Sequence, residues 1–95
     1  MNVTKKKIVN QISKKTGIDS VETEVVIEGF LSVIQDTLLK GQSIELRGFG
    51  TFKLVRRKEK KARNPKKNLD VIVPERNVPV FKFTKDFKQK IAEKE

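Results

Sequence analysis

Hydrophobic and polar positions near the start of the chain recur with the period of an α-helix. The spacing predicts a first helix over residues 5–16, because Ile8 and Ile12 fall on one face. Thr4 is a residue type that caps helix N-termini, and Gly17 is a common helix stop. The chain therefore begins with a short amphipathic helix.

A longer helix is predicted from about residue 21 to residue 40. Residues 19–22 form a capping box before it, and Gly41 ends it. Gly29 in its middle costs about 1 kcal/mol relative to Ala, which favours close approach of another backbone over simple tolerance of a weak position. Its apolar residues, which cover more than one narrow stripe, include Val26, Ile27, Phe30, Leu31, Ile34 and Leu38. So much apolar helix surface in a small protein favours pairing of helices between chains.

After the second helix the pattern changes to the alternation typical of β-strands. Residues 43–55 predict a strand pair, interrupted by Gly48-Phe49-Gly50, where two glycines allow a tight turn or a bulge. The glycines lack the spacing of a phosphate-binding loop. We expect Phe49 in the core, in preference to a role as a platform for nucleic-acid bases.

A β-branched segment over residues 69–73 is predicted to return antiparallel to residues 53–61. Residues 53–76 would then form a long two-stranded arm with its tip near Pro65. The turn formers at this tip are Asn64 and Asn68. An isolated hairpin is only marginally stable in water, so we expect the arm to be mobile until it lies on a partner.

The last elements predicted are a strand over residues 79–83 and a short helix from residue 85 to about residue 92. Thr84 is placed to cap that helix, and Phe87 and Ile91 are expected to face inward. The elements together predict an α+β fold in one domain over residues 1–95. Its expected parts are a helical dimerisation part over 1–42, a sheet with its arm over 43–83, and a C-terminal helix over 84–95.

The distribution of charge along the chain indicates what kind of partner the protein binds. The chain has 22 Lys and Arg against 12 Asp and Glu, a formal net charge of +10. Residues 53–67 hold nine of those cations against Glu59 alone, whereas the segments on either side are nearly balanced. The cationic run is internal and flanked by patterned segments, which favours a phosphate backbone as its partner over a solvated tail. For Lys5, Lys6 and Lys7, a solvated first turn and a secondary phosphate contact are equally consistent with the sequence.

Composition excludes several classes of chemistry. The chain has no His and no Cys, which excludes disulfides, thiolate or imidazole metal sites and catalysis by those groups. The remaining Lys, Asp, Glu and Ser show no spacing that would join them as an acid–base pair. No apolar run approaches the roughly 20 residues that span a bilayer. We therefore expect a soluble protein that is not an enzyme, with no cofactor, metal, membrane partner or small-molecule substrate.

Three motifs carry a resemblance to a known family. The sequence has GFGTF at residues 48–52, RNP at residues 63–65 and VPVFK at residues 78–82. With these motifs and their spacing, the chain resembles the HU/IHF family of bacterial histone-like DNA-bending proteins over essentially its whole length. The resemblance implies an intertwined dimer with a helical body, a three-stranded antiparallel sheet and a long β-ribbon arm in each chain. It also implies duplex DNA as the partner and the nucleoid of the bacterial cytoplasm as the location.

The resemblance further implies which residues bind DNA. Pro65 would intercalate between base pairs at the tip of the arm and kink the duplex. The other implied DNA-binding residues are Arg57, Lys60 and Lys61 along the arm, Arg63, Asn64 and Lys66 at the tip, and Lys82, Lys85 and Lys88 on the flank of the body. Three places depart from the family's usual pattern: Ala62 before RNP, Lys66-Lys67-Asn68 after it, and Phe83-Thr84 before the last helix. At the tip we expect Asn68 to take the positive φ that glycine adopts in the family.

The most favoured function is an architectural DNA-binding protein that bends and compacts duplex DNA as a homodimer with low sequence specificity. One alternative is a sequence-preferring subunit like those of integration host factor, often a heterodimer, whose β subunits residues 44–48 resemble. A less favoured alternative is a basic RNA-binding protein. The chain has no Tyr or Trp on which single-stranded bases would stack, and the grooves of A-form RNA do not suit such arms.

Overall fold

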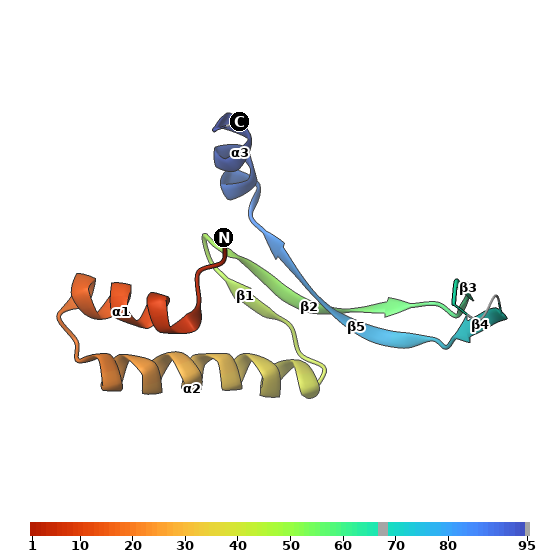
Figure 1. Cartoon of the computed structure of the whole chain (residues 1–95), viewed down its shortest axis with the longest axis horizontal. Coiled ribbons are helices and arrows are strands. Elements are labelled where there is room, and N and C mark those ends of the chain that lie inside the picture. The colour runs from red at the N-terminus through yellow and green to blue at the C-terminus, as the bar shows by residue number, and fades with distance from the viewer. Residues whose placement is uncertain (67–68, 95) are drawn as a thin grey trace. The chain divides into compact units, whose positions relative to one another are not determined.

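The computed structural model describes residues 1–66 and 69–94. Along the chain, these residues form two helices, then five strands and then a final helix (Figure 1). The chain divides into two compact units, Met1–Asp36 and Thr37–Glu95. Asn68 lies outside the described residues, and so do its predicted positive φ and its role as a turn former. The described helices include none that is long and apolar enough to cross a membrane.

The first helix, α1 (Lys5–Thr16), has the predicted bounds. The Oγ1 atom of Thr4 accepts a hydrogen bond from the backbone N–H of Lys7 at 3.3 Å, so the predicted N-cap is confirmed. Gly17 ends the helix with φ of 79°, a left-handed conformation that glycine adopts without strain.

The second helix, α2 (Ser20–Leu39), begins and ends one residue earlier than predicted, and Gly41 follows it with φ of 80°. Within the first unit the two helices are joined at their surface by an ion pair, in which Lys5 Nζ lies 2.7 Å from Glu28 Oε1. The hydrogen bond to Glu28, and next the charge of Glu28, raise the pKa of Lys5 above its ordinary value. In this structure the Lys5 ammonium is therefore bound to a carboxylate.

The helices bury little of their apolar surface within one chain. Val9 and Ile34 are buried, together with Thr23, whose hydroxyl donates to the carbonyl of Asp19 at 2.9 Å. The large apolar side chains of α2 that remain exposed include Val21, Val25, Val26, Phe30 and Leu31. A Cβ atom built on Gly29 would meet no described atom within 4 Å. The apolar surface of α2 thus exceeds what this chain covers, as the sequence predicts.

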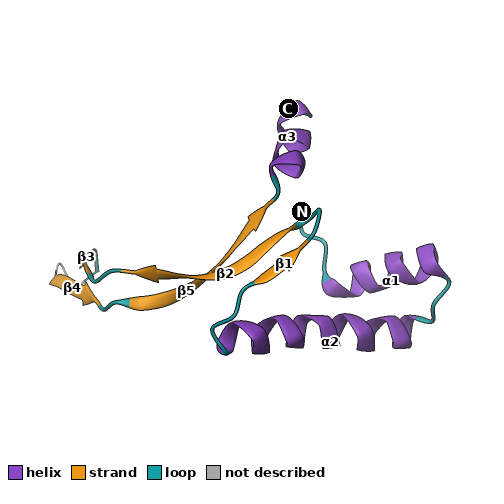
Figure 2. Ribbon diagram, turned by 180° about the vertical axis from the view of Figure 1, so that it is seen from behind, coloured by secondary structure: helices purple, strands orange, loops and turns teal. Residues whose placement is uncertain are grey.

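The strands form two antiparallel sheets (Figure 2). The first contains β1 (Ile44–Leu46), β2 (Gly50–Arg57) and β5 (Arg76–Phe83), in the order β1-β2-β5. The second contains β3 (Lys60–Asn64) and β4 (Leu69–Val73) alone. The predicted three-stranded antiparallel sheet with a two-stranded ribbon beyond it is confirmed.

The predicted register of the ribbon is wrong in one respect. Strand β4 pairs with residues 60–64, whereas the prediction paired it with residues 53–61. The preceding residues of β2 pair instead with β5, which begins at Arg76 and not at Pro79. The ladder is interrupted on both strands, and on the returning strand the interruption contains Pro74, which has no N–H to donate to a ladder. The ribbon therefore has two segments with a junction between them.

Residues 47–49 form a tight turn between β1 and β2, which is one of the two alternatives that the glycines allow, and Gly50 begins β2. Gly48 has φ of 80°, and Gly50 is buried where a Cβ atom would collide with the ring of Phe81 and lie 2.5 Å from the carbonyl oxygen of Lys82. The ring centroid of Phe49 lies 5.4 Å from that of Phe81. Phe49 packs in an aromatic cluster, although 49% of its surface stays exposed in the single chain.

The last helix, α3 (Lys85–Glu93), ends one residue later than predicted. The side chain of Thr84 accepts a hydrogen bond from the N–H of Phe87 at 3.4 Å, so this N-cap is also confirmed. The expectation that Phe87 and Ile91 face inward is only partly correct. Phe87 contacts the ring of Phe83 at 4.8 Å, but 38% of Phe87 and 50% of Ile91 remain exposed. Helical period predicts a common face, but it does not say whether the same chain covers that face.

Candidate nucleic-acid interface

The distal segment of the ribbon, formed by β3 and β4, carries a dense group of the predicted DNA-binding residues. Directly opposed residues of an antiparallel pair point to the same face. Lys61 and Arg63 lie on one face, opposite Ile72 and Asp70, and both cations are exposed. Lys60 lies on the other face, opposite Val73. The ribbon therefore presents cationic side chains to both of its sides, as a strand does when successive basic residues alternate in direction.

The tip of the ribbon is shaped by a local hydrogen bond. The Oδ1 atom of Asn64 accepts from the backbone N–H of Lys66 at 3.0 Å, which closes a turn around Pro65. Asn64 is thereby confirmed as a turn former. Pro65 and Lys66 are exposed at this turn, next to Arg63 in the sequence. The structure therefore brings the predicted tip residues together, with an apolar pyrrolidine ring at the exposed end.

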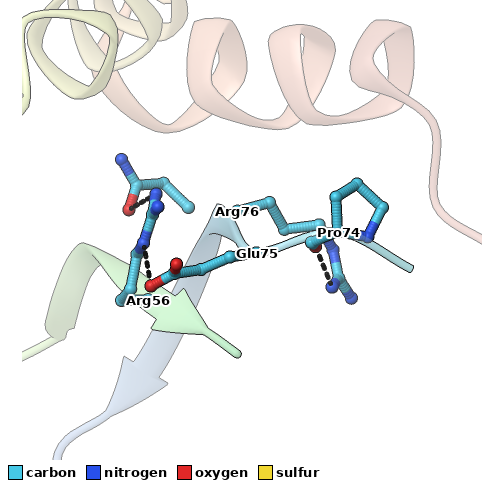
Figure 3. A network of polar contacts seen from close by, with 5 residues as sticks. Arg56, Pro74, Glu75 and Arg76 are labelled. Atoms are coloured by element: carbon cyan, nitrogen blue, oxygen red, sulfur yellow. Dashed lines mark hydrogen bonds and ion pairs between the residues drawn. The ribbon is translucent and has the colours of Figure 1, made fainter. Parts of the chain in front are cut away.

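The proximal segment of the ribbon is formed by the ends of β2 and β5 that lie next to the junction. It ends in a polar network that the sequence did not predict (Figure 3). The Nε atom of Arg56 donates to Glu75 Oε1 at 3.0 Å, and its Nη1 donates to Asn77 Oδ1 at 3.4 Å. The Nη1 atom of Arg76 donates to the carbonyl oxygen of Pro74 at 3.4 Å. Glu75 stands in the interruption between β4 and β5, so the ion pair links β2 to the junction of the two ribbon segments. The pairing of Arg56 opposite Asn77 is visible only once the register is known.

Arg57 ends β2 at the same junction, where it is exposed and lies opposite Arg76. Two like charges directly opposed in a ladder repel each other. A polyanion beside this pair would relieve that repulsion. We therefore count Arg57 with the predicted DNA-binding residues of the arm, although it belongs to the first sheet and not to the β3–β4 segment.

The flank residues form a second group, away from the arm along the chain. Lys82 lies near the far end of β5 from Arg76, about 20 Å along a strand at roughly 3.3 Å per residue. It points to the opposite face of the sheet from Phe81, because successive strand residues alternate. Lys85 and Lys88 follow on α3, where their spacing of three places them on one exposed face. The predicted site thus consists of an arm group and a C-terminal group.

A family model described as bacterial DNA-binding protein matches residues 3–92 of the chain. The chain belongs to this family. It is the family of HU and of integration host factor, whose members are structural DNA-binding proteins and not enzymes.

Relatives of both kinds resemble the chain over nearly all of its length. DNA-binding protein HU of Buchnera aphidicola is 35% identical over 91 residues, which cover 96% of this chain and 99% of that protein. The β subunit of integration host factor from Paraburkholderia phymatum is 34% identical over 90 residues, or 94% of this chain and 84% of that subunit. The Anabaena HU–DNA cocrystal structure superimposes with a TM-score of 0.88 at 30% identity, over 95% of this chain and 98% of that chain. The fold of that HU structure therefore extends over nearly all of this chain.

Proposed function

We propose that the chain is an architectural DNA-binding protein that, as a homodimer, bends and compacts duplex DNA through the minor groove with low sequence specificity. The observation that carries this proposal is the exposed, two-sided cationic ribbon that ends in Pro65. The membership of the chain in a family of DNA-binding proteins supports it, as does the likeness to an HU solved with DNA.

The dimensions of the ribbon explain why binding in the minor groove would bend the duplex. The backbones of paired strands are about 4.8 Å apart, and side chains widen the ribbon further. The minor groove of B-DNA is only about 6 Å wide. A two-stranded ribbon can therefore lie there only if the groove opens, and a groove that opens on one side bends the duplex away from it. Lys60, Lys61 and Arg63 would hold the ribbon against the phosphates on both walls.

Pro65 is suited to the role of a wedge. Its ring is apolar and exposed at the tip, and the bond from Lys66 N–H to Asn64 holds the turn around it. Insertion of such a ring between two base pairs costs a few kcal/mol of stacking, which the larger contact area of bent DNA offsets. Proline also has no N–H that the insertion would leave unpaired.

The exposed apolar surface of α2 supports the homodimer. Val9 and Ile34 are buried, whereas Val25, Val26 and Phe30 are not, and surface of this kind in a small protein indicates an interface. The open space at Gly29 would let a second backbone approach. We infer that residues 1–42 serve mainly in dimerisation, the arm within residues 53–76 in DNA binding, and residues 84–95 as a flanking helix of the same domain.

A sequence-preferring function like that of integration host factor is the alternative, because a β subunit of that factor is nearly as similar to this chain as HU is. A set of duplexes of equal length and unrelated sequence separates the two. Affinities within about tenfold of one another support low specificity, whereas specific DNA-binding proteins prefer their sites by at least about a thousandfold. Light scattering of the pure protein determines whether one chain suffices for the dimer.

Competition between nucleic acids tests the proposal against RNA binding. A labelled DNA duplex bound to the protein is challenged with unlabelled duplex DNA, duplex RNA and single-stranded DNA of the same sequence and length. We expect duplex DNA to compete best, because the deep, narrow major groove and wide, shallow minor groove of A-form RNA do not fit the ribbon. Equal competition by duplex RNA would contradict minor-groove binding by the arm. In a bacterial cell, we expect the protein in the nucleoid.

A further inference from the structure

The connection between β5 and α3 is built from two residues with several contacts each. Phe83, the last residue of β5, has its ring centroid 5.4 Å from Phe49, 4.7 Å from Phe81 and 4.8 Å from Phe87. The contacts with Phe49 and Phe81 are edge-on, which is a favoured geometry for aromatic pairs. Phe83 therefore joins the turn before β2, the strand β5 and the first turn of α3 in one aromatic cluster.

Thr84 adds hydrogen bonds to two of these three places, the turn before β2 and the first turn of α3. Its backbone N–H donates to the carbonyl oxygen of Phe49 at 3.1 Å, which extends the β2–β5 ladder by one step. Its side chain accepts from the N–H of Phe87 at 3.4 Å, and its own carbonyl accepts from the N–H of Lys88 at 3.1 Å. The residue directly before α3 is therefore bonded to the turn that precedes β2. Figure 2 shows α3 following β5 after a short connection.

We propose that Phe83 and Thr84 are positioning residues, which hold α3 in a fixed direction on the sheet. Lys85 and Lys88 can then contact the phosphates of bent DNA without losing orientational freedom on binding. This inference rests on the proposed function. A lysine on a helix that can swing loses orientational freedom when it binds, whereas one on a fixed helix has already lost it. Lys85 directly follows Thr84, and Lys88 is bonded to it through the backbone, so both depend on the position of this residue.

The salt dependence of DNA binding measures the contribution of the two lysines. The logarithm of the affinity falls by about 0.9 per phosphate contact against the logarithm of the salt concentration. On a duplex of about 35 base pairs, long enough to reach both flanks of the homodimer, the K85Q/K88Q variant removes four lysines and should therefore lose about 3.6 from this slope. T84A removes the capping hydroxyl and keeps both lysines. We expect it to lose part of this slope, because a helix that swings leaves its lysines on the phosphates for only part of the time. T84S keeps the hydroxyl and should retain the wild-type slope.

The combination of the variants tests whether Thr84 acts through the lysines. In the T84A/K85Q/K88Q variant the slope should equal that of K85Q/K88Q, because no flank cation is left to position. F83A, which removes the aromatic contacts and leaves the cap, should reproduce the loss seen with T84A. Light scattering checks that each variant keeps the oligomeric state of the wild type, and T84A remains informative if F83A does not fold.

Two results would overturn the inference in distinguishable ways. A wild-type slope in T84A, or an additive loss in the triple variant, would show that the β5–α3 connection does not position the lysines, and the flank contact itself would stand. An unchanged slope in K85Q/K88Q would remove the flank contact from the proposed function, together with the inference that depends on it. DNA binding by the arm would not be affected by either result.

Discussion

Arg56 lies at the junction of the two ribbon segments with its guanidinium already bonded inside the chain, to Glu75 at 3.0 Å and to Asn77 at 3.4 Å. A carboxylate this close competes with DNA phosphates for the same cation. The Glu75→Gln variant keeps the shape of the side chain and removes its charge. We expect this change to free Arg56 for a phosphate and to strengthen DNA binding.

The structure sets the size of the expected effect. Both side chains of the ion pair are more than half exposed, so its loss should lower the free energy of unfolding by no more than about 1 kcal/mol. One additional phosphate contact from each chain of the homodimer steepens the salt dependence by about 1.8 in total. Between 50 and 200 mM salt, the affinity advantage of E75Q over the wild type should therefore shrink by about 12-fold.

Fluorescence anisotropy with a labelled duplex, titrated at several salt concentrations, gives these slopes directly. E59Q is the matched control, because it removes the same charge from the interruption between β2 and β3. A general gain of positive charge would make E59Q and E75Q alike, whereas release of Arg56 predicts the steeper slope for E75Q. The reasoning is refuted if the two variants agree, or if R56Q/E75Q keeps the gain of E75Q.

Three further substitutions test other parts of the molecule. P65A should reduce the bend of the bound duplex strongly while its affinity stays within about tenfold of the wild type, as measured by energy transfer and anisotropy on the same samples; equal loss of both would contradict the wedge. G29A would stabilise an isolated helix by about 1 kcal/mol. We expect it instead to lower the free energy of unfolding in urea, because a second chain approaches there, and a gain in stability would contradict this. E28Q should return the pKa of Lys5 toward 10.5, visible by NMR titration. Because Glu28 raises this pKa, the stability that the pair contributes is present in full below pH 10.5 and disappears as the pH rises through the folded-state value, so wild type and E28Q should converge there.

The helices could be predicted closely because their ends depend on local signals. Thr4 and Thr84 cap through hydrogen bonds to backbone only three residues away, and Gly17 and Gly41 take the left-handed conformation that stops a helix. Each signal lies within one turn of the helix end that it determines. The bounds of α1 therefore agree with prediction, and those of α2 and α3 differ by one residue at most at either end.

The strand register could not be predicted in the same way, because it depends on which distant residues meet. β-branched content identified the Leu69–Val73 strand, but its pairing with Lys60–Asn64 required the position of the interruption at Pro74. The Arg56–Glu75 ion pair spans nineteen positions in the sequence and became visible only with that register. The motif around Pro65 placed the tip of the arm, whereas nothing local in the sequence indicated the polar contacts at the junction of the two ribbon segments.

Exposed apolar residues mark a second limit of the sequence. The period of α3 places Phe87 and Ile91 on one face, yet both remain partly exposed in the single chain. Apolar patterning predicts that a face will be covered without identifying the chain that covers it. For α2 the amount of apolar surface was itself the signal, since one small chain could not cover it.

The central claim is that the arms bend DNA, and energy transfer between the two ends of a doubly labelled duplex of about 35 base pairs tests it most directly. This length is well below the roughly 150 base pairs of the DNA persistence length, so the free duplex is nearly straight and its ends stay far apart. The account predicts that energy transfer rises on titration with the protein and reaches a plateau when anisotropy shows saturation. Saturated binding with no rise in energy transfer would show that the protein only coats the duplex, and would contradict the account.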